Sequence, residues 1–173
     1  MALVLNSELV ILKLKSSINN IFAFKIKKDD CCLCLGDSLE HLEEAKFIAG
    51  TYNLNATFIC GETPKQKREQ IMADMRAGKY NVLCATYALA KLGLDVPRLN
   101  KLMLMTPHRD RTSIQQAIGR VMRPFEGKSQ PVVYDLWDSK VSACKKWGRE
   151  RVKVYHELSC EVVGGPKVRG SRR

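Results

Sequence analysis

The chain has 173 residues and a formal net charge of +11, with 29 Lys and Arg against 18 Asp and Glu. This length suits one compact domain with a full core and is short for two. Its 45% hydrophobic and 27% charged residues are ordinary for a globular protein, and no run of about eighteen apolar residues is present that could span a bilayer.

The first 29 residues are a lead-in of ambiguous structure, with a helix favoured over a strand for residues 6–28. From residue 30 onward, short apolar runs alternate with helical segments, which is the pattern of an α/β fold with a mostly parallel sheet. The expected strands are Cys31–Leu35, Ala56–Cys60, Val82–Ala85, Lys101–Met105 and Pro131–Leu136. The expected helices cover about 39–48, Pro64–Ala77, Thr112 or Ser113 to Arg123, and Ser139–Leu158. We expect the residues from Gly164 onward to form a frayed tail.

Local signals predict several helix boundaries. Ser38 is a candidate N-cap for the helix after the first of these strands. Thr63 and Gln66 have the spacing of a capping box around Pro64, a residue type favoured at the first helical position. Gly78 is suited to end that helix, because glycine readily adopts the left-handed conformation found after a helix.

Open parallel sheets bind ligands outside the carboxyl ends of their strands. We therefore expect the chemistry of this protein in the turns that follow the strands. Those turns are Gly36-Asp37-Ser38, Gly61-Glu62-Thr63, Thr86 onward, Thr106-Pro107-His108 and Asp135-Leu136-Trp137-Asp138.

The N-terminus and the cysteines favour a reducing cytoplasm. The segment MALVLNSELVILKLKSS lacks a basic start and is interrupted by polar residues, which makes it a poor signal peptide. Five of the seven cysteines lie in apolar runs expected to be buried strands, namely Cys31, Cys32, Cys34, Cys60 and Cys84. No second C-x-x-C pair or paired histidine completes a zinc site with Cys31 and Cys34. The scattered histidines His41, His108 and His156 are interpreted as surface residues.

Most of the positive charge lies near the C-terminus. Residues 139–173 contain ten Lys and Arg against three Glu, a local charge of +7. Such a field favours a polyanionic partner, most simply nucleic acid, although a solvated basic tail would have the same composition. The tail could also pack back on the sheet or mediate assembly, and Trp137 and Trp147 could be core residues.

The most informative stretch is Gln116–Arg123, with the sequence QAIGRVMR. It places Arg120 and Arg123 three residues apart on one predicted helix, so that they lie on the same helical face. A guanidinium group is planar and always charged, which suits it to the charge that develops on a transferring phosphoryl group. A solvated basic helix face is the alternative interpretation.

Together, these segments resemble the C-terminal RecA-like domain of superfamily 2 DEAD/DEAH-like helicases, and in appearance most of all the phage repair helicases. Cys31–Ser38 is similar to motif IV, Lys91–Pro97 after Ala85 and Thr86 is similar to motif V, and Gln116–Arg123 matches motif VI, Q-x-x-G-R-x-x-R, at every fixed position. The resemblance implies a three-layer RecA-like domain over residues 30–138, with a central mostly parallel sheet flanked by helices. Residues 1–29 then form the lead-in, and residues 139–173 form a basic helical extension and flexible tail.

The resemblance also implies roles for individual residues. Arg120 and Arg123 would be the catalytic arginine fingers. Gly93 would allow a backbone turn that lets Asp95 face a nucleotide ribose, and Gly119 would permit close packing of the helix. The implied nucleotide-binding group is Gly93, Asp95, Gln116 and Gly119.

A second implied group would contact the sugar-phosphate backbone of a nucleic acid. It consists of Ser38, Gly61 and Thr86, each of which follows an expected strand. Ser38 and Thr86 could instead cap the segments that they precede. Thr63 and Arg68 are weaker candidates for the same contact.

The sequence contains no G-x-x-x-x-G-K-[ST] loop and no strand that ends in an Asp-Glu pair. In the family, the N-terminal RecA-like domain carries both, and ATP lies between the two domains. The implied partners are therefore nucleic acid, with DNA favoured over RNA, and a RecA-like domain carrying Walker A and B motifs that shares ATP and holds Mg²⁺. No membrane partner is expected, and the favoured location is a bacterial or phage-infected cytoplasm.

Three hypotheses follow from the missing elements. The chain could be half of a helicase that acts on an ATP-binding domain of another chain, and it would not hydrolyse ATP alone at a useful rate. It could instead be a non-enzymatic nucleic-acid-binding or regulatory module that keeps the helicase fold. It could also be a fragment of a longer helicase.

Overall fold

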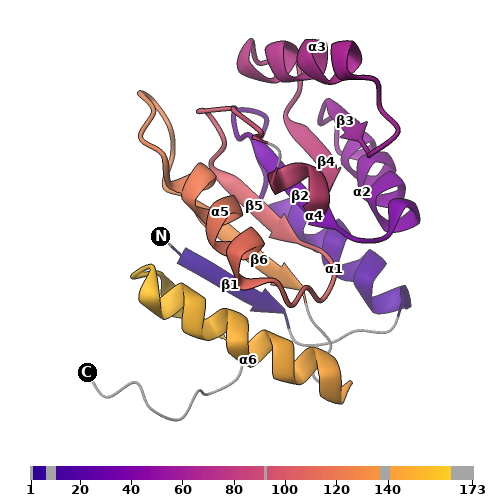
Figure 1. Ribbon diagram of the computed structural model, residues 1–173. Coiled ribbons are helices and arrows are strands. Elements are labelled where there is room, and N and C mark those ends of the chain that lie inside the picture. The colour runs from indigo at the N-terminus through magenta and orange to yellow at the C-terminus, as the bar shows by residue number, and fades with distance from the viewer. Residues whose placement is uncertain (1, 7–10, 92, 137–140, 165–173) are drawn as a thin grey trace.

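The computed structural model describes residues 2–6, 11–91, 93–136 and 141–164, with side chains from Ser17 onward. The described strands form one parallel sheet in the order β3-β4-β2-β5-β6-β1-β7 (Figure 1). They are β1 (Ala2–Asn6), β2 (Cys32–Gly36), β3 (Ala56–Ile59), β4 (Val82–Thr86), β5 (Lys101–Leu104), β6 (Val132–Leu136) and β7 (Glu161–Val163). The helices are α1 (Ile11–Phe24), α2 (Leu39–Thr51), α3 (Lys65–Arg76), α4 (Tyr87–Lys91), α5 (Arg111–Met122) and α6 (Ser142–Glu157).

The sheet lies between two layers of helices (Figure 1). Successive residues of a strand point to opposite faces, so Leu33 and Leu35 of β2 pack on one side and Cys32 and Cys34 on the other. The first side is covered by α3, α4, α5 and α6, and the second by α1 and α2. The three-layer RecA-like fold expected from the sequence is confirmed.

Three elements were not expected. β1 extends the sheet beside β6 within the lead-in that was expected to be helical or irregular, and the helix α1 follows it. α4 forms in the segment after Thr86 that was expected to be a loop, and β7 adds an edge strand after α6. These short segments gain their structure from pairing with a neighbouring strand or packing on the sheet, which local sequence patterns do not report. Residues 165–173 of the expected tail, Trp137, and the boundary at residues 138 and 139 lie outside the described residues.

Two predicted helix caps are wrong. α5 is capped by Asp110, whose carboxylate accepts hydrogen bonds from the Thr112 amide at 3.1 Å and the Ser113 hydroxyl at 2.6 Å, and not by Thr112 or Ser113. The capping box before α3 does not form, because the Thr63 hydroxyl accepts from the Cys60 amide at 3.0 Å and shapes the preceding turn. Ser38 caps α2 as expected, at 3.4 Å from the His41 amide.

Replacing Asp110 by Ala should lower the free energy of unfolding by about 1 kcal/mol at neutral pH, the usual value of a lost N-cap. Lys91 at 2.6 Å, and then Ser113, hold the pKa of this carboxyl below its ordinary value of 3.8. A lowered folded-state pKa stabilises the fold above 3.8, and that stabilisation is lost as the pH falls. The difference between the two proteins should therefore shrink below pH 4, as measured by urea unfolding. A constant difference across this range would contradict the assignment.

All seven cysteines lie in the described part of the chain and are free thiols. Cys31 packs into the cluster on one face of the sheet and Cys34 into the cluster on the other face. Burial raises the pKa of Cys31 to about 12, so it stays a protonated apolar side chain. Cys31 and Cys34 therefore do not converge on a shared ligand. Cys60 is only half-buried and follows β3, where a buried strand position was expected.

No described helix has the length and apolar character needed to cross a membrane.

Candidate nucleotide and nucleic-acid site

The fold brings Ser38, Gly61 and Thr86 to the carboxyl ends of three neighbouring strands. β4 lies between β3 and β2, with Thr86 beside Gly36 and Ala85 beside Ile59 in the register. Ser38 and Gly61 each follow these paired positions by two residues. Gly61 is exposed, whereas Ser38 and Thr86 are half-buried. Ser38 also caps α2, and helix N-termini present free N–H groups to anions.

A polar cluster beside this group was missed from the sequence. The Asp37 amide donates to the Thr106 hydroxyl at 3.0 Å, and the Asp37 carboxylate lies 3.2 Å from Nδ1 of His108. The His108 ring stacks on Tyr87 at 3.9 Å between centroids, and the Tyr87 hydroxyl donates to the Thr106 carbonyl. The interpretation of His108 as a surface residue is therefore wrong. Its partners lie 21 and 71 residues away along the chain, so no local pattern could have revealed them.

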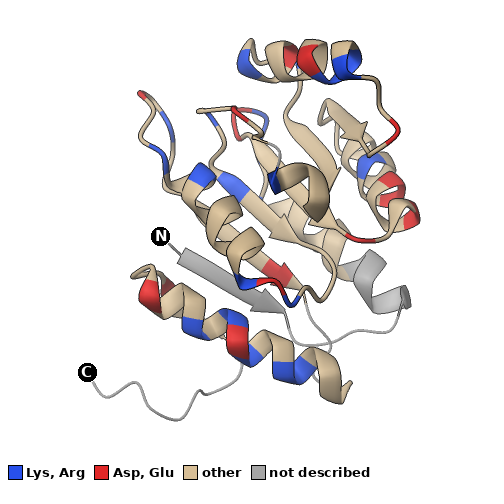
Figure 2. Cartoon of the chain, viewed as in Figure 1, with Lys and Arg blue, Asp and Glu red and all other residues tan. Residues whose placement is uncertain are grey.

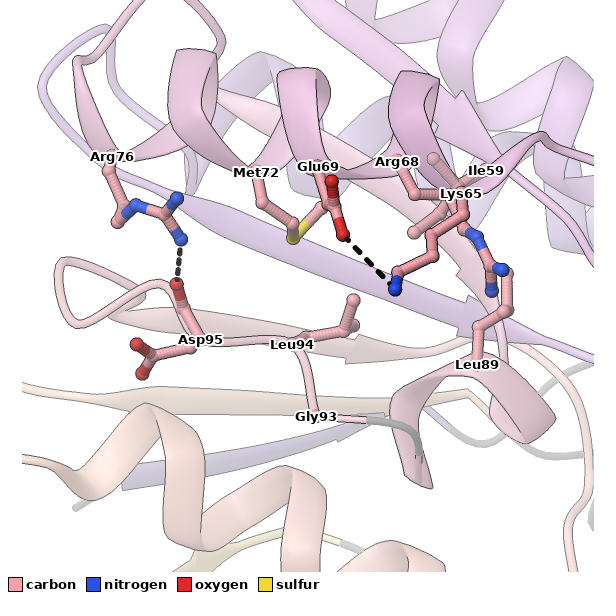
Figure 3. Close-up of a pocket in the computed structure, with 10 residues that line it drawn as sticks. All are labelled: Ile59, Lys65, Arg68, Glu69, Met72, Arg76, Leu89, Gly93, Leu94 and Asp95. Carbon is pink, nitrogen blue, oxygen red and sulfur yellow. Dashed lines mark hydrogen bonds and ion pairs between the residues drawn. The ribbon is translucent and has the colours of Figure 1, made fainter.

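Arg120 of α5 and Arg123, the C-terminal cap of that helix, both contact the loop that contains Asp95. Arg120 Nη1 donates to the Leu94 carbonyl at 2.9 Å, and Arg123 Nη1 forms an ion pair with Asp95 Oδ1 at 2.9 Å. Arg76 at the end of α3 donates to the Asp95 carbonyl at 3.0 Å (Figure 3). Three arginines, one at the end of α3 and two at or just after the end of α5, therefore converge on two consecutive residues. The part of Arg76 in this arrangement was not recognised in the sequence.

Arg120 has no carboxylate partner among the described residues. It is half-buried, and its Nε atom is buried without a hydrogen-bond partner. Burial, and then the neighbouring Arg123, lowers the pKa of its guanidinium group. A cation that is desolvated and repelled by a like charge is stabilised by a bound anion.

The remaining nucleotide-site candidates lie on the same side of α5 or in the adjoining loop. Gln116 and Gly119 are exposed on α5, and Gln116 precedes Arg120 by four residues, a spacing that places the two on one helical face. Gly93 has a φ of +93°, which confirms that glycine is needed there for the turn. The expected close packing at Gly119 is not found within this chain, because a Cβ at that position would meet no atom within 4 Å.

A hollow of about 440 Å³ lies between α3 and the loop Gly93–Asp95 (Figure 3). Its walls combine apolar side chains with cations. The apolar lining comes from Ile59, Met72, Leu89 and Leu94, and the cations are Lys65, Arg68 and Arg76. Lys65 faces Glu69 at 3.9 Å, and Arg68 has a buried Nε without a hydrogen-bond partner among the described residues.

The candidate residues therefore form two groups that lie apart in the fold. Ser38, Gly61 and Thr86 follow strands, as expected for ligand contacts in an open sheet. Arg120 and Arg123 lie at the far end of α5, which starts at the carboxyl edge and runs back over about 18 Å (Figure 1). The arginine group therefore lies away from the turns after the strands, at the end of the helix on which the sequence placed it.

The basic extension is held on the sheet by a buried ion pair. Arg151 of α6 donates to both oxygens of Asp135 at 2.7 Å, and the Tyr155 hydroxyl donates to the same carboxylate at 2.5 Å. Asp135 is at the carboxyl end of β6, and the side chains of the pair are 0% and 3% exposed. This arrangement, which we call the α6 latch, decides that α6 packs back on the sheet. Part of its positive charge is thereby neutralised inside the protein.

Comparison with known proteins supports the helicase family that the sequence motifs resemble. The family described as "Helicase conserved C-terminal domain" matches residues 12–124. A protein of Acanthamoeba polyphaga mimivirus assigned as an ATP-dependent RNA helicase is 34% identical over 81 residues, 47% of this chain and 15% of that protein. UvrABC system protein B of Clavibacter michiganensis subsp. michiganensis is 25% identical over 134 residues, 75% of this chain and 19% of that protein. The chain thus matches only about a fifth or less of the length of these relatives.

Solved structures agree in fold. The C-terminal domain of the DEAD-box protein Dbp5 superposes with a TM-score of 0.74 at 15% identity, covering 94% of this chain and 88% of that domain. S. cerevisiae Dbp5 bound to RNA and ADP BeF3 gives a TM-score of 0.72 at 13% identity, covering 94% of this chain and 41% of that one. The chain therefore belongs to the family of helicase conserved C-terminal domains and has the RecA-like fold of the C-terminal half of superfamily 2 helicases.

Proposed function

We propose that this chain is the second RecA-like half of an ATP-dependent nucleic-acid helicase or translocase. Arg120 and Arg123 would act on ATP held mainly by a RecA-like domain that lies on another chain or segment. Ser38, Gly61 and Thr86 would contact the backbone of a single strand. Movement along nucleic acid would then require both halves.

The observation that carries this proposal is the state of Arg120. Among the described residues, its half-buried guanidinium group has no carboxylate partner and its Nε has no hydrogen-bond partner, which is costly unless an anion binds there. Arg123, the residue that follows the last turn of α5, is exposed, and its only side-chain partner among the described residues is Asp95, in an exposed ion pair. Such a pair is weak in water and can exchange partners. These residues fit a triphosphate that approaches from outside the chain.

The surface around Arg123 also suits a protein partner. Met122 and Phe125 flank it with 41% and 50% of their surface exposed, and Gly119 faces open space one turn before. Large exposed apolar side chains beside a functional group are typical of interaction sites. In the proposed assembly, the Walker A and B motifs of the partner cradle the phosphates and hold Mg²⁺.

In this assembly, each candidate site residue of this chain has a chemical role. Bound ATP would supply the reactive phosphoryl group, and this chain would contribute fixed charges and hydrogen-bond acceptors around it. Arg120 and Arg123 stabilise negative charge, while the Asp95 carboxylate accepts hydrogen bonds from ribose hydroxyl groups. Arg76 orients the loop by its bond to the Asp95 carbonyl.

The test is an ATPase assay of this chain alone, of a candidate motor domain alone, and of the two mixed, each with and without single-stranded DNA or RNA. A neighbouring reading frame with a Walker A loop and an Asp-Glu box would supply the candidate. We expect hydrolysis to rise only in the mixture, and more with DNA than with RNA. If the mixture is no faster than the motor domain alone and the chain still binds nucleic acid, the non-enzymatic module is supported instead.

Replacing Gly119 by Ala should lower the ATPase rate of the mixture without lowering the stability of this chain. Alanine is favoured over glycine in a helix by about 1 kcal/mol, and the added Cβ meets nothing within 4 Å in this chain. The variant should therefore unfold at equal or higher urea concentration, yet support less ATP hydrolysis in the mixture because the partner approaches closely there. Unchanged hydrolysis would place the interface elsewhere.

A further inference from the structure

The loop before α5 and the basic helix α6 meet in a surface that none of the motifs accounts for. The Arg109 guanidinium lies over the Trp147 ring, 5.8 Å from the ring centroid. Hollows of about 440 and 310 Å³ are each lined by this pair. Asp37 lines the larger one, and Lys146 lines the smaller one. We refer to this surface as the Arg109–Trp147 groove.

The groove has an unbalanced positive charge. Each carboxylate that lines it has a partner: Asp37 lies beside His108, Asp110 pairs with Lys91, and Glu150 pairs with Lys153. Of the cations, Arg111 pairs with Glu157 and Arg151 with Asp135. Arg109 and Lys146 are exposed and form no ion pair with any described residue. Two free cations therefore border one half-exposed indole ring.

The groove also continues the proposed path of a nucleic acid. Asp37 precedes Ser38, the proposed phosphate contact at the carboxyl end of β2, and it lines the larger hollow together with Trp147. A strand that crosses the ends of β4 and β2 would next reach this hollow. Charges of both signs lie along α6, with basic residues in the majority (Figure 2).

Arg109 and Trp147 are not needed to attach α6. The α6 latch fixes the helix through fully buried groups, while Arg109 is exposed and sits near the outer limit of a cation–π contact. An exposed arginine can turn from the ring to a phosphate and leave the indole face to a base. Aromatic faces bordered by cations are how proteins bind single strands without reading their sequence.

We propose that Arg109, Lys146 and Trp147 form an additional subsite for single-stranded nucleic acid, in which a base stacks on Trp147 and phosphates bind Arg109 and Lys146. The subsite rests on the proposed function, since it extends the strand path that begins at Ser38 and Thr86. It gives α6 a part in holding the strand.

The test uses the full chain with Trp137→Phe, so that Trp147 is its only tryptophan. Titration with oligothymidylate or oligouridylate should quench Trp147 fluorescence as the oligonucleotide binds. Trp147→Leu should weaken binding of a labelled oligonucleotide by roughly tenfold, and Arg109→Ala should reduce the slope of log affinity against log salt by about one. The matched control is Arg149→Ala, which removes an exposed charge from α6 outside the groove and leaves the partner of Glu150 in place.

The outcomes separate the subsite from the proposed function. If Trp147 fluorescence does not change at saturation, or if Arg109→Ala and Trp147→Leu bind like Arg149→Ala while Ser38→Ala with Thr86→Ala binds weakly, the subsite is wrong and the proposed function stands. If the unchanged chain binds no oligonucleotide at low salt, the subsite and the backbone contacts fail together. Circular dichroism of each variant checks that α6 remains folded.

Discussion

Replacing Arg123 by Ala should lower the nucleic-acid-stimulated ATPase rate of the mixture with its motor domain by about 10³- to 10⁵-fold, the range found for arginine fingers. The reason is electrostatic: the guanidinium fork stabilises charge that exists only while the phosphoryl group is transferred. Arg123→Lys keeps the charge but loses the planar guanidinium fork, so its ATPase rate should lie between that of the unchanged chain and that of Arg123→Ala. The measurement is the steady-state rate at saturating ATP and nucleic acid.

Loss of stability should not explain that result. The pair of Arg123 and Asp95 is exposed at 51% and 66%, and exposed pairs contribute at most about 1 kcal/mol. The unfolding curve of Arg123→Ala should therefore nearly overlay that of the unchanged chain. Arg149→Ala, which removes an exposed arginine from α6, is the matched control and should keep its activity under the same conditions. Equal ATPase rates for Arg123→Ala and Arg149→Ala would contradict the proposed role of Arg123 as an arginine finger.

Replacing Arg151 by Ala should have the largest effect on stability, a loss of about 3–5 kcal/mol in the free energy of unfolding. The substitution leaves the Asp135 carboxylate fully buried, with the Tyr155 hydroxyl as its remaining side-chain partner. A buried charge without its counter-ion is far more costly than the loss of an exposed ion pair. Urea unfolding followed by circular dichroism measures the difference.

Two further variants show whether the buried charge is the cause. Lys153→Ala breaks the exposed pair with Glu150 on the same helix and should cost less than about 1 kcal/mol. Arg151→Met combined with Asp135→Leu removes both charges and should recover much of the lost stability. If Arg151→Ala is as stable as Lys153→Ala, the α6 latch does not hold the extension in place.

The fold class and most of the sheet could be predicted because their signals are local. Continuous apolar runs predicted β2 through β6, and the proline and glycine near α3 marked its ends. β1 and β7 were missed because a short strand at the side of a sheet depends on its neighbour for its structure. The cap of α5 was misplaced by two or three residues, since several residues there could accept the same amide hydrogens.

The candidate residues were found by their motifs, but their contacts were not. Asp95 and Arg123 are 28 residues apart, and Asp37 and His108 are 71 apart. The sequence around each of these four residues gives no sign of these contacts, because the fold brings the partners together. Likewise, the sequence could not show that no described residue of this chain packs beside Gly119, because the space beside a helical glycine depends on what packs there.

The sequence by itself determined that this chain is a helicase C-terminal domain with paired arginines and without a phosphate-binding loop of its own. Motifs and apolar periodicity are short-range properties, so they can be recognised in the sequence without knowledge of the fold. Only the tertiary structure decided that Arg120 forms no ion pair with a described carboxylate, that Ser38 and Thr86 follow neighbouring strands while Arg120 lies near the end of α5, and that the α6 latch neutralises part of the basic extension. The desolvation and ion pairing of a charged side chain depend on which other side chains lie near it in a low-dielectric environment. Packing determines those neighbours, and many of them are distant in the sequence.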